Sequence, residues 1–312
     1  MQTRIGILGI GGVGGYFGGL LAKAYASSES VDVVFIARGL TKQHIAENGL
    51  KIVLDESEMT VFPSKVSDHP DEIGKLDYLI CATKTYDIET SLSSVARCIT
   101  KNTIILPLYN GVDATERIST LFPDNEVLQG CVYIVSQIET PGTIRKMGFY
   151  EKLFFGSDTA PIGKLRNLQL LFQKANIQSY LVENIEDTVW EKFVFISTLA
   201  SATSYLNQNI GEILHSAESR KFYVDLLHEI TLLAAVKGIN LPDDIIMQTI
   251  LKLEKTPHEA TSSMHRDILA GNNFELASLT EYVVNEAVKY EVDTPTYKMV
   301  LDKLSKISSL AE

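Results

Sequence analysis

The sequence predicts an α/β protein made of a parallel-sheet domain followed by an all-helical domain. Two observations support this prediction. Through residues 1–182, short β-branched or apolar runs alternate with helical or turn segments, which is the pattern of βαβ units around a parallel sheet. Through residues 183–312, apolar residues recur every three or four positions, as they do in amphipathic helices. We therefore expect one domain over 1–182 and a second, helical domain over 183–312.

The elements of the first domain are expected to be short strands. They are Arg4–Leu8, Val31–Ile36, Tyr78–Ala82, Thr103–Leu106, Val127–Val135 and a last strand near Gln178–Val182. In the second domain one helical run ends before Gly238, a residue type that often terminates helices. This run consists of Phe222, Leu226, Ile230, Leu233 and Lys237. A later run with the same spacing consists of Leu276, Leu279, Val283, Ala287 and Tyr290.

Composition excludes several classes of protein. Hydrophobic residues make up 45% of the chain and charged residues 21%, with a mean hydropathy of +0.07, which is typical of globular proteins. The formal net charge of −11 would repel a phosphate backbone, so no nucleic-acid partner is expected. The two uncharged stretches, 5–22 and 193–211, are too rich in glycine or polar residues to predict a membrane span. We therefore expect a cytoplasmic protein with no membrane partner.

The cysteines and histidines do not predict a metal site. Cys81, Cys98 and Cys131 are widely spaced and form no CxxC pair, so they are expected to be buried, reduced side chains. The 6 histidines show no metal-ligand spacing.

A glycine-rich segment follows the first expected strand and opens a helical pattern. Gly9, Gly11 and Gly14 have the spacing GxGxxG. The first glycine permits a tight turn, the second lets the backbone approach a pyrophosphate, and the third allows close packing of helix on strand. A merely structural glycine turn is the alternative. The context favours a Rossmann-type dinucleotide-binding domain in which Gly9, Gly11, Gly12, Val13 and Gly14 hold the cofactor.

The end of the second expected strand indicates which dinucleotide is bound. An acidic residue at this place would bind the ribose hydroxyls of NAD, whereas this chain has Arg38. A guanidinium there can pair with a 2′-phosphate, so NADP is the expected cofactor. The alternative is that Arg38 is an ordinary surface arginine.

Two further polar residues follow later strands. Lys84 lies after the third expected strand and Asn110 after the fourth. Open α/β sheets bind ligands at these strand ends, so a lysine could meet cofactor phosphate and an asparagine amide could orient nicotinamide or substrate. Taken singly, either residue could equally be a turn residue.

Taken together in this order, the motifs resemble the ketopantoate reductase (2-dehydropantoate 2-reductase) family over nearly the whole chain. The motifs are the glycine-rich start, Arg38-Gly39, Lys84, Asn110-Gly111, Trp190-x-Lys192, Ser262-Ser263-Met264-x-x-Asp267 and Glu275. The resemblance implies NADPH-dependent reduction of 2-dehydropantoate to pantoate, on the route to pantothenate and coenzyme A. A small-molecule 2-oxo acid is then the expected partner, and the chain is also compatible with a homodimer.

The resemblance also implies roles for individual residues. Lys192 is expected to be the general acid and Glu275 its catalytic partner. Asn110 and Ser263 are expected to bind substrate, while Lys84, Asn110 and Glu275 are expected to reach the cofactor. The chemistry agrees, because a protonated amine can stabilise and then neutralise the oxygen of a ketone that receives a hydride. The alternatives are a lysine whose stem lies along an amphipathic helix, a solvated glutamate and a helix-capping serine.

The chain departs from the family pattern on the helix that carries the lysine. Family members commonly have asparagines four and eight residues after the lysine, where this chain has Ile196 and Ala200. Fewer polar groups would weaken recognition of ketopantoate and would favour a more apolar 2-oxo acid. An enzyme acting on another 2-oxo acid or an imine, or a non-catalytic NADP-binding regulatory protein, therefore remains as an alternative. His265, two residues after Ser263, is a further candidate for the cleft.

Overall fold

The computed structural model describes residues 2–157, 159–160 and 162–308. The chain divides into two compact units. The first unit contains the residues up to Tyr109 together with Ala114–Ile185, and the second contains Asn110–Asp113 and the chain from Glu186 onward. The expected boundary lay after residue 182, and the short segment 110–113 was not expected to join the helical unit.

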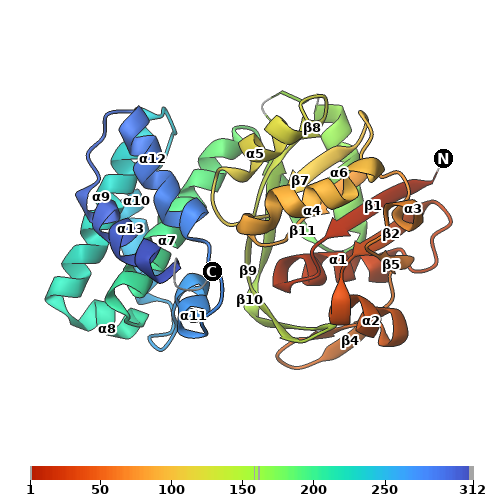
Figure 1. The fold of residues 1–312 in the computed structure, drawn as a ribbon, viewed down its shortest axis with the longest axis horizontal. Helices are drawn as coiled ribbons and strands as arrows, with labels where there is room; N and C mark the ends of the chain where they lie inside the picture. The colour runs from red at the N-terminus through yellow and green to blue at the C-terminus, as the bar shows by residue number, and fades with distance from the viewer. Residues whose placement is uncertain (1, 158, 161, 309–312) are drawn as a thin grey trace. The chain divides into compact units, whose positions relative to one another are not determined.

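The first unit is built on a six-stranded parallel sheet (Figure 1). Its strands are β1 (Thr3–Leu8), β2 (Val31–Ile36), β5 (Lys65–Ser67), β6 (Tyr78–Cys81), β7 (Ile104–Pro107) and β8 (Glu126–Val127). They lie in the order β5-β2-β1-β6-β7-β8, which is the doubly wound order 3-2-1-4-5-6. The predicted fold class is therefore confirmed. In this topology ligands bind where the strand order reverses, at the carboxyl ends of β1 and β6.

Helices cover both faces of this sheet. The alternation of side chains along the strands sends Ile5 and Ile7 to one hydrophobic core and Leu8 to another. The first core also includes residues of α1 (Gly12–Ala24) and α6 (Ile162–Lys174). The second core, on the opposite face, includes residues of α3 (Pro70–Ile73), α4 (Ile88–Val95) and α5 (Ala114–Leu121). Helix α2 (Gly39–Asn48) follows β2.

A second, five-stranded sheet packs on α1, and the sequence did not indicate it. Its strands are β3 (Leu50–Val53), β4 (Glu58–Val61), β9 (Gln129–Thr140), β10 (Thr143–Gly156) and β11 (Gln178–Leu181). The close approach depends on glycine, because a Cβ at Gly15 would lie 2.6 Å from Ile144 and a Cβ at Gly19 would lie 2.4 Å from Ile52. The glycines of α1 therefore allow the second sheet to pack closely on this helix, in addition to the glycines that shape the preceding loop.

The prediction of one continuous strand over Val127–Val135 is wrong. Strand β8 ends at Val127 and belongs to the parallel sheet, whereas β9 begins at Gln129 and pairs antiparallel with β10. The fully buried Leu128 lies at the crossing point. The change of sheet was not visible in the sequence, because both strands present a similar apolar pattern.

The second unit is helical and has its own hydrophobic core. Its elements are α7 (Ile185–Leu206), α8 (Ile210–His215), α9 (Ala217–Val236), α10 (Ile245–Glu254), α11 (Ser263–Leu269), a π-helical turn (Ala277–Glu281), α12 (Tyr282–Lys289) and α13 (Pro295–Ser308). The predicted helix before Gly238 is confirmed as α9, and Gly238 has a φ of +80°. Among the described residues no helix is long and apolar enough to cross a membrane.

Candidate active site

The glycine loop has the geometry of a dinucleotide cradle. Gly9 has a φ of +91°, and a Cβ there would lie 2.8 Å from the backbone nitrogen of Thr83. A Cβ at Gly14 would lie 2.0 Å from the carbonyl oxygen of Gly9, so this position also excludes a side chain. A Cβ at Gly11 would meet no atom within 4 Å, which leaves the backbone open to a ligand. These three glycines fit the roles predicted from their spacing.

Helix α1 presents an uncompensated N-terminus directly after this loop. Its N-cap residue, Gly11, makes no side-chain capping bond, and its first turn, which includes Gly12 and Val13, contains no acidic residue. The free N–H groups and the positive end of the helix dipole therefore remain available to an anion. This end of α1 fits a pyrophosphate.

Arg38 follows β2 and is exposed at the start of α2. The register places Ile36 of β2 and Cys81 of β6 on either side of Leu8, so the segments after these three residues begin at one edge of the sheet. No carboxylate within the described part of the chain forms an ion pair with the Arg38 guanidinium. Arg38 fits the recognition of a phosphate near the glycine loop.

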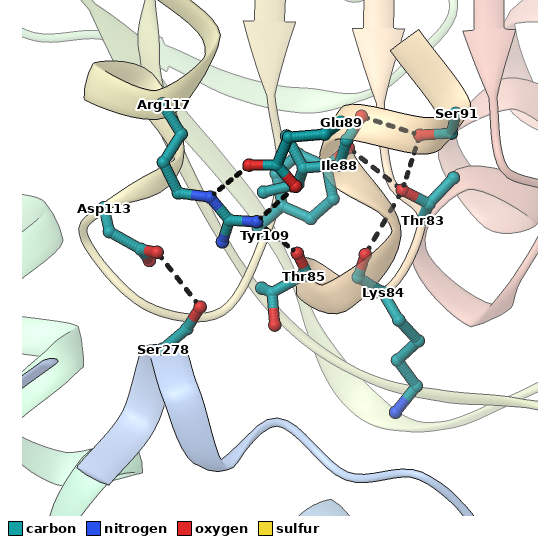
Figure 2. Close-up of polar contacts among 10 residues, drawn as sticks. All are labelled: Thr83, Lys84, Thr85, Ile88, Glu89, Ser91, Tyr109, Asp113, Arg117 and Ser278. Carbon is teal, nitrogen blue, oxygen red and sulfur yellow. Dashed lines mark hydrogen bonds and ion pairs between the residues drawn. The ribbon is translucent and has the colours of Figure 1, made fainter. Parts of the chain in front are cut away.

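Lys84 lies in the turn after β6, and hydrogen bonds hold that turn (Figure 2). The Thr83 hydroxyl lies 3.1 Å from the hydroxyl of Tyr109, at the end of β7. From α5, Arg117 donates a 2.9 Å hydrogen bond to the carbonyl oxygen of Thr85 and two 2.8 Å hydrogen bonds to the carboxylate of Glu89. These bonds lower the pKa of Glu89. Figure 2 shows the Lys84 side chain extending away from this network.

The second unit brings two predicted site residues together. The Nζ of Lys192, on α7, donates a 3.0 Å hydrogen bond to the Oδ1 of Asn110. Lys192 is only 7% exposed, and its neighbours in the chain, Trp190 and Phe193, are fully buried. Few water molecules can reach an amine in such an apolar setting, so solvent competes little for its hydrogen bond with Asn110.

The remaining predicted residues of this unit lie around α11 and before the π-helical turn. Glu275 is 5% exposed and precedes that turn. Ser263 is half-buried as the first residue of α11, while the helix is capped by the preceding Ser262, whose hydroxyl accepts a hydrogen bond from the backbone N–H of His265. The capping alternative therefore applies to Ser262 and leaves the Ser263 hydroxyl for another role.

Both ring nitrogens of His265 lie within hydrogen-bond distance of other side chains. Its Nδ1 lies 2.7 Å from the hydroxyl of Thr261 and its Nε2 lies 2.9 Å from the Oδ1 of Asn207. Burial lowers the pKa of His265. The ring thus connects α11 with the residue that follows α7, and both of its nitrogens have hydrogen-bond partners.

Two polar residues near the site were missed in the sequence. Asp113 accepts a 3.1 Å hydrogen bond from the hydroxyl of Ser278, in the π-helical turn. The only sign of them in the sequence was their position, three residues after Asn110 and three residues after Glu275.

At the two positions where the family commonly has asparagine, Ala200 is buried and Ile196 is partly buried against the second-unit core.

A doubly wound sheet with a glycine loop, followed by a helical unit, is the architecture of a dinucleotide-binding protein, and comparison with known proteins identifies its family. Residues 5–159 match the family model described as ketopantoate reductase PanE/ApbA, and residues 184–308 match that of its C-terminal part. The chain belongs to the ketopantoate reductase family, and the resemblance is thereby confirmed.

Three similar proteins illustrate the match. The crystal structure of 2-dehydropantoate 2-reductase from Porphyromonas gingivalis W83 is 34% identical, with a TM-score of 0.84, over 98% of this chain and 100% of that chain. The uncharacterized oxidoreductase YkpB of Bacillus subtilis (strain 168) is 25% identical over 96% of each chain. A ternary structure of D-mandelate dehydrogenase with NADH and anilino(oxo)acetate has a TM-score of 0.87 over 99% of each chain; at 20% identity it shows a shared fold.

Proposed function

We propose that the protein is an NADPH-dependent reductase of a 2-oxo acid and that 2-dehydropantoate is its substrate. The observation that carries this proposal is the 3.0 Å hydrogen bond from Lys192 to Asn110 in a buried setting. A protein that only sensed a dinucleotide would need the glycine loop but would have no use for a buried ammonium. The family relationship supports the same reaction class.

The first unit would hold the cofactor through three groups. The glycine loop and the N-terminus of α1 suit the pyrophosphate, and Arg38 suits a 2′-phosphate because it is cationic and exposed. Lys84 adds a second positive charge after β6, the strand that pairs with β1. The related fold of D-mandelate dehydrogenase binds NADH, so the preference for NADPH here depends on Arg38 in particular.

The second unit would provide the proton. When bound, the nicotinamide supplies a hydride to the carbonyl carbon of the 2-oxo acid. The electron pair of the carbonyl bond moves to its oxygen, which takes a proton from the Lys192 ammonium, and the resulting amine regains a proton from water. Asn110 orients the ammonium by accepting one of its hydrogen bonds. Glu275, which is 5% exposed, would act as the catalytic partner of the lysine. Ser263 would bind the substrate carboxylate.

A second candidate substrate follows from the apolar side chains on α7. Ile196 and Ala200 offer no hydrogen bond to the 4-hydroxyl of 2-dehydropantoate. A 2-oxo acid with a hydrocarbon side chain would lose nothing at these positions, since it has no hydroxyl to satisfy. This alternative keeps the same proton donor and the same reaction.

A panel of substrates tests both candidates. The purified protein is mixed with NADPH and with 2-dehydropantoate, 2-oxoisovalerate or phenylglyoxylate, and the loss of NADPH absorbance is followed. We expect turnover of 2-dehydropantoate. Turnover of only the hydrocarbon acids would move the protein to the second candidate, and no turnover of any 2-oxo acid would contradict the proposed reaction.

A further inference from the structure

The segment Asn110–Asp113 is held by the second unit, although it lies within the sequence of the first. Its first residue, Asn110, receives the hydrogen bond from Lys192, and its last residue, Asp113, receives the hydrogen bond from Ser278. Between them, Val112 packs against the hydrophobic core of the helical unit. The segment is therefore attached at both ends and in the middle.

The backbone of this segment lies close to the π-helical turn because residue 111 is glycine. Gly111 has a φ of +101°, and a Cβ there would lie 3.1 Å from the Cβ and from the carbonyl oxygen of Ser278. A side chain at this position would strain the backbone and crowd the neighbouring turn. Gly111 thus allows the loop to lie directly on the π-helical turn Ala277–Glu281.

The attachment at Asp113 uses a buried hydroxyl. Ser278 is 0% exposed, and its Oγ donates the 3.1 Å hydrogen bond to the Oδ2 of Asp113 (Figure 2). A hydrogen bond to an ionised acceptor is stronger than one between neutral groups. The donor lies in a π-helical turn, a local widening of a helix that often occurs at functional sites. That turn begins two residues after Glu275.

We propose that Asp113 and Ser278 are positioning residues that fix Asn110 against the Lys192 ammonium. This inference rests on the proposed function, since it assigns Lys192 the role of proton donor. The Ser278–Asp113 bond anchors the far end of the short loop and so limits the positions that Asn110 can take. Loss of the bond lets Asn110 move relative to Lys192, and misplacement of a reacting group by about 1 Å can cost as much as 10²-fold in rate.

Ser278→Ala removes the donor while leaving the Lys192 and Asn110 side chains intact. We expect kcat to fall by about tenfold while the KM for NADPH stays close to that of the parent, because the glycine loop belongs to the first unit. Ser278→Thr keeps the hydroxyl and should restore most of kcat. Asp113→Asn keeps an oxygen acceptor and should stay closer to the parent than Asp113→Ala. Measuring kcat well below the unfolding temperature of each variant separates this pattern from a loss of stability.

Ser201→Ala is the matched control. Ser201 is also 0% exposed, and its hydroxyl lies 2.9 Å from that of Thr280 in the same π-helical turn, so this variant loses a buried hydrogen bond without touching the loop. Comparable thermal unfolding of the two alanine variants with a kcat loss in Ser278→Ala only supports the proposal. Equal kcat values for Ser278→Ala and Ser201→Ala overturn the proposal. Where Ser278→Ala fails to fold, Asp113→Ala provides the same comparison.

Hydrogen exchange separates this proposal from the proposed function. In Ser278→Ala, the backbone amides of residues 110–113 should exchange faster than in the parent and in Ser201→Ala. Faster exchange with unchanged kcat would show that the bond holds the loop without positioning the proton donor, and it would overturn the proposal. Parent-like exchange and kcat in Ser278→Ala, beside an inactive Lys192→Ala, would overturn the proposal and leave the proposed function standing.

Discussion

The ammonium of Lys192 donates a 3.0 Å hydrogen bond to the side-chain oxygen of Asn110, a residue 82 positions earlier in the chain. The two residues come from different halves of the sequence, but both belong to the helical unit. Because the amide oxygen can only accept this bond, it orients the ammonium without removing its proton. This pair is the observation on which the proposed role of Lys192 as proton donor rests.

Replacing Lys192 tests that role. Lys192→Ala should lower kcat by about 10²- to 10⁴-fold, as expected for the loss of a general acid, and should leave the Kd for NADPH largely unchanged. Stopped-flow and fluorescence titration measure the two quantities. Lys221→Ala is a suitable control, because Lys221 is an exposed lysine that pairs with Asp225 elsewhere in the same unit. Turnover of Lys192→Ala within a few-fold of the parent would exclude Lys192 as the donor.

Replacing Arg38 tests the choice of cofactor. Arg38→Glu should reduce the ratio of kcat/KM for NADPH to that for NADH, because the new carboxylate would repel a 2′-phosphate and could bind the ribose hydroxyls of NADH. Arg220→Glu, at a surface arginine that pairs with Glu254, is the control for charge reversal alone. Equal kcat/KM for the two cofactors in the parent would contradict the assignment of NADP.

Replacing Arg117 tests how the Lys84 turn is held. Arg117→Ala removes the hydrogen bonds to the Thr85 carbonyl and the Glu89 carboxylate. The turn should then hold Lys84 less precisely, and the KM for NADPH should rise by about tenfold with a smaller change in kcat. Glu89→Gln keeps an acceptor for the guanidinium and should have a weaker effect. A KM for NADPH equal to that of the parent in Arg117→Ala would contradict this role.

Introducing an amide at residue 196 tests substrate recognition. Ile196→Asn should lower the KM for 2-dehydropantoate by about tenfold if the new hydrogen bond contributes about 1.4 kcal/mol. Kinetics with 2-oxoisovalerate, which has no hydroxyl, provide the matched comparison and should show no gain. An unchanged KM for 2-dehydropantoate, in a variant that unfolds at the temperature of the parent, would mean that residue 196 does not contact the substrate.

The buried ion pair of Glu286 with Lys237 predicts a pH dependence of stability. Burial alone would raise the pKa of Glu286, but hydrogen bonds and charge interactions with Lys237 and Lys289 outweigh burial and lower it from 4.5. A carboxylate with a depressed pKa in the folded state stabilises that state above about pH 4.5 and loses this contribution as the pH falls toward the folded-state pKa.

Glu286→Gln tests this dependence. The variant should be less stable near neutral pH by about 3 kcal/mol, because it leaves a buried ammonium without its partner. Its free energy of unfolding should change less than that of the parent between about pH 5 and pH 3, the range in which the parent's carboxylate takes up its proton. Denaturant unfolding at several pH values measures both effects. Parallel stability curves for the two proteins would contradict the prediction.

Elements whose signals are local could be predicted from the amino-acid sequence. The apolar runs predicted β1, β2 and β6, the three-and-four spacing of Leu226, Ile230 and Leu233 predicted α9, and GxGxxG predicted the loop after β1. Each of these patterns reflects which side of one segment is buried, or which backbone angles one glycine must adopt, so it is complete within a few residues.

Features that need a distant partner could not be predicted in this way and emerged from the folded chain. The passage of the chain from β8 to β9 at Leu128 depends on β7 in one sheet and β10 in the other. The membership of residues 110–113 in the helical unit depends on Lys192 and Ser278, which follow much later in the chain. A single segment carries no record of which distant surface will cover it, because hydrophobic burial and hydrogen bonding are satisfied by any partner of suitable shape and polarity.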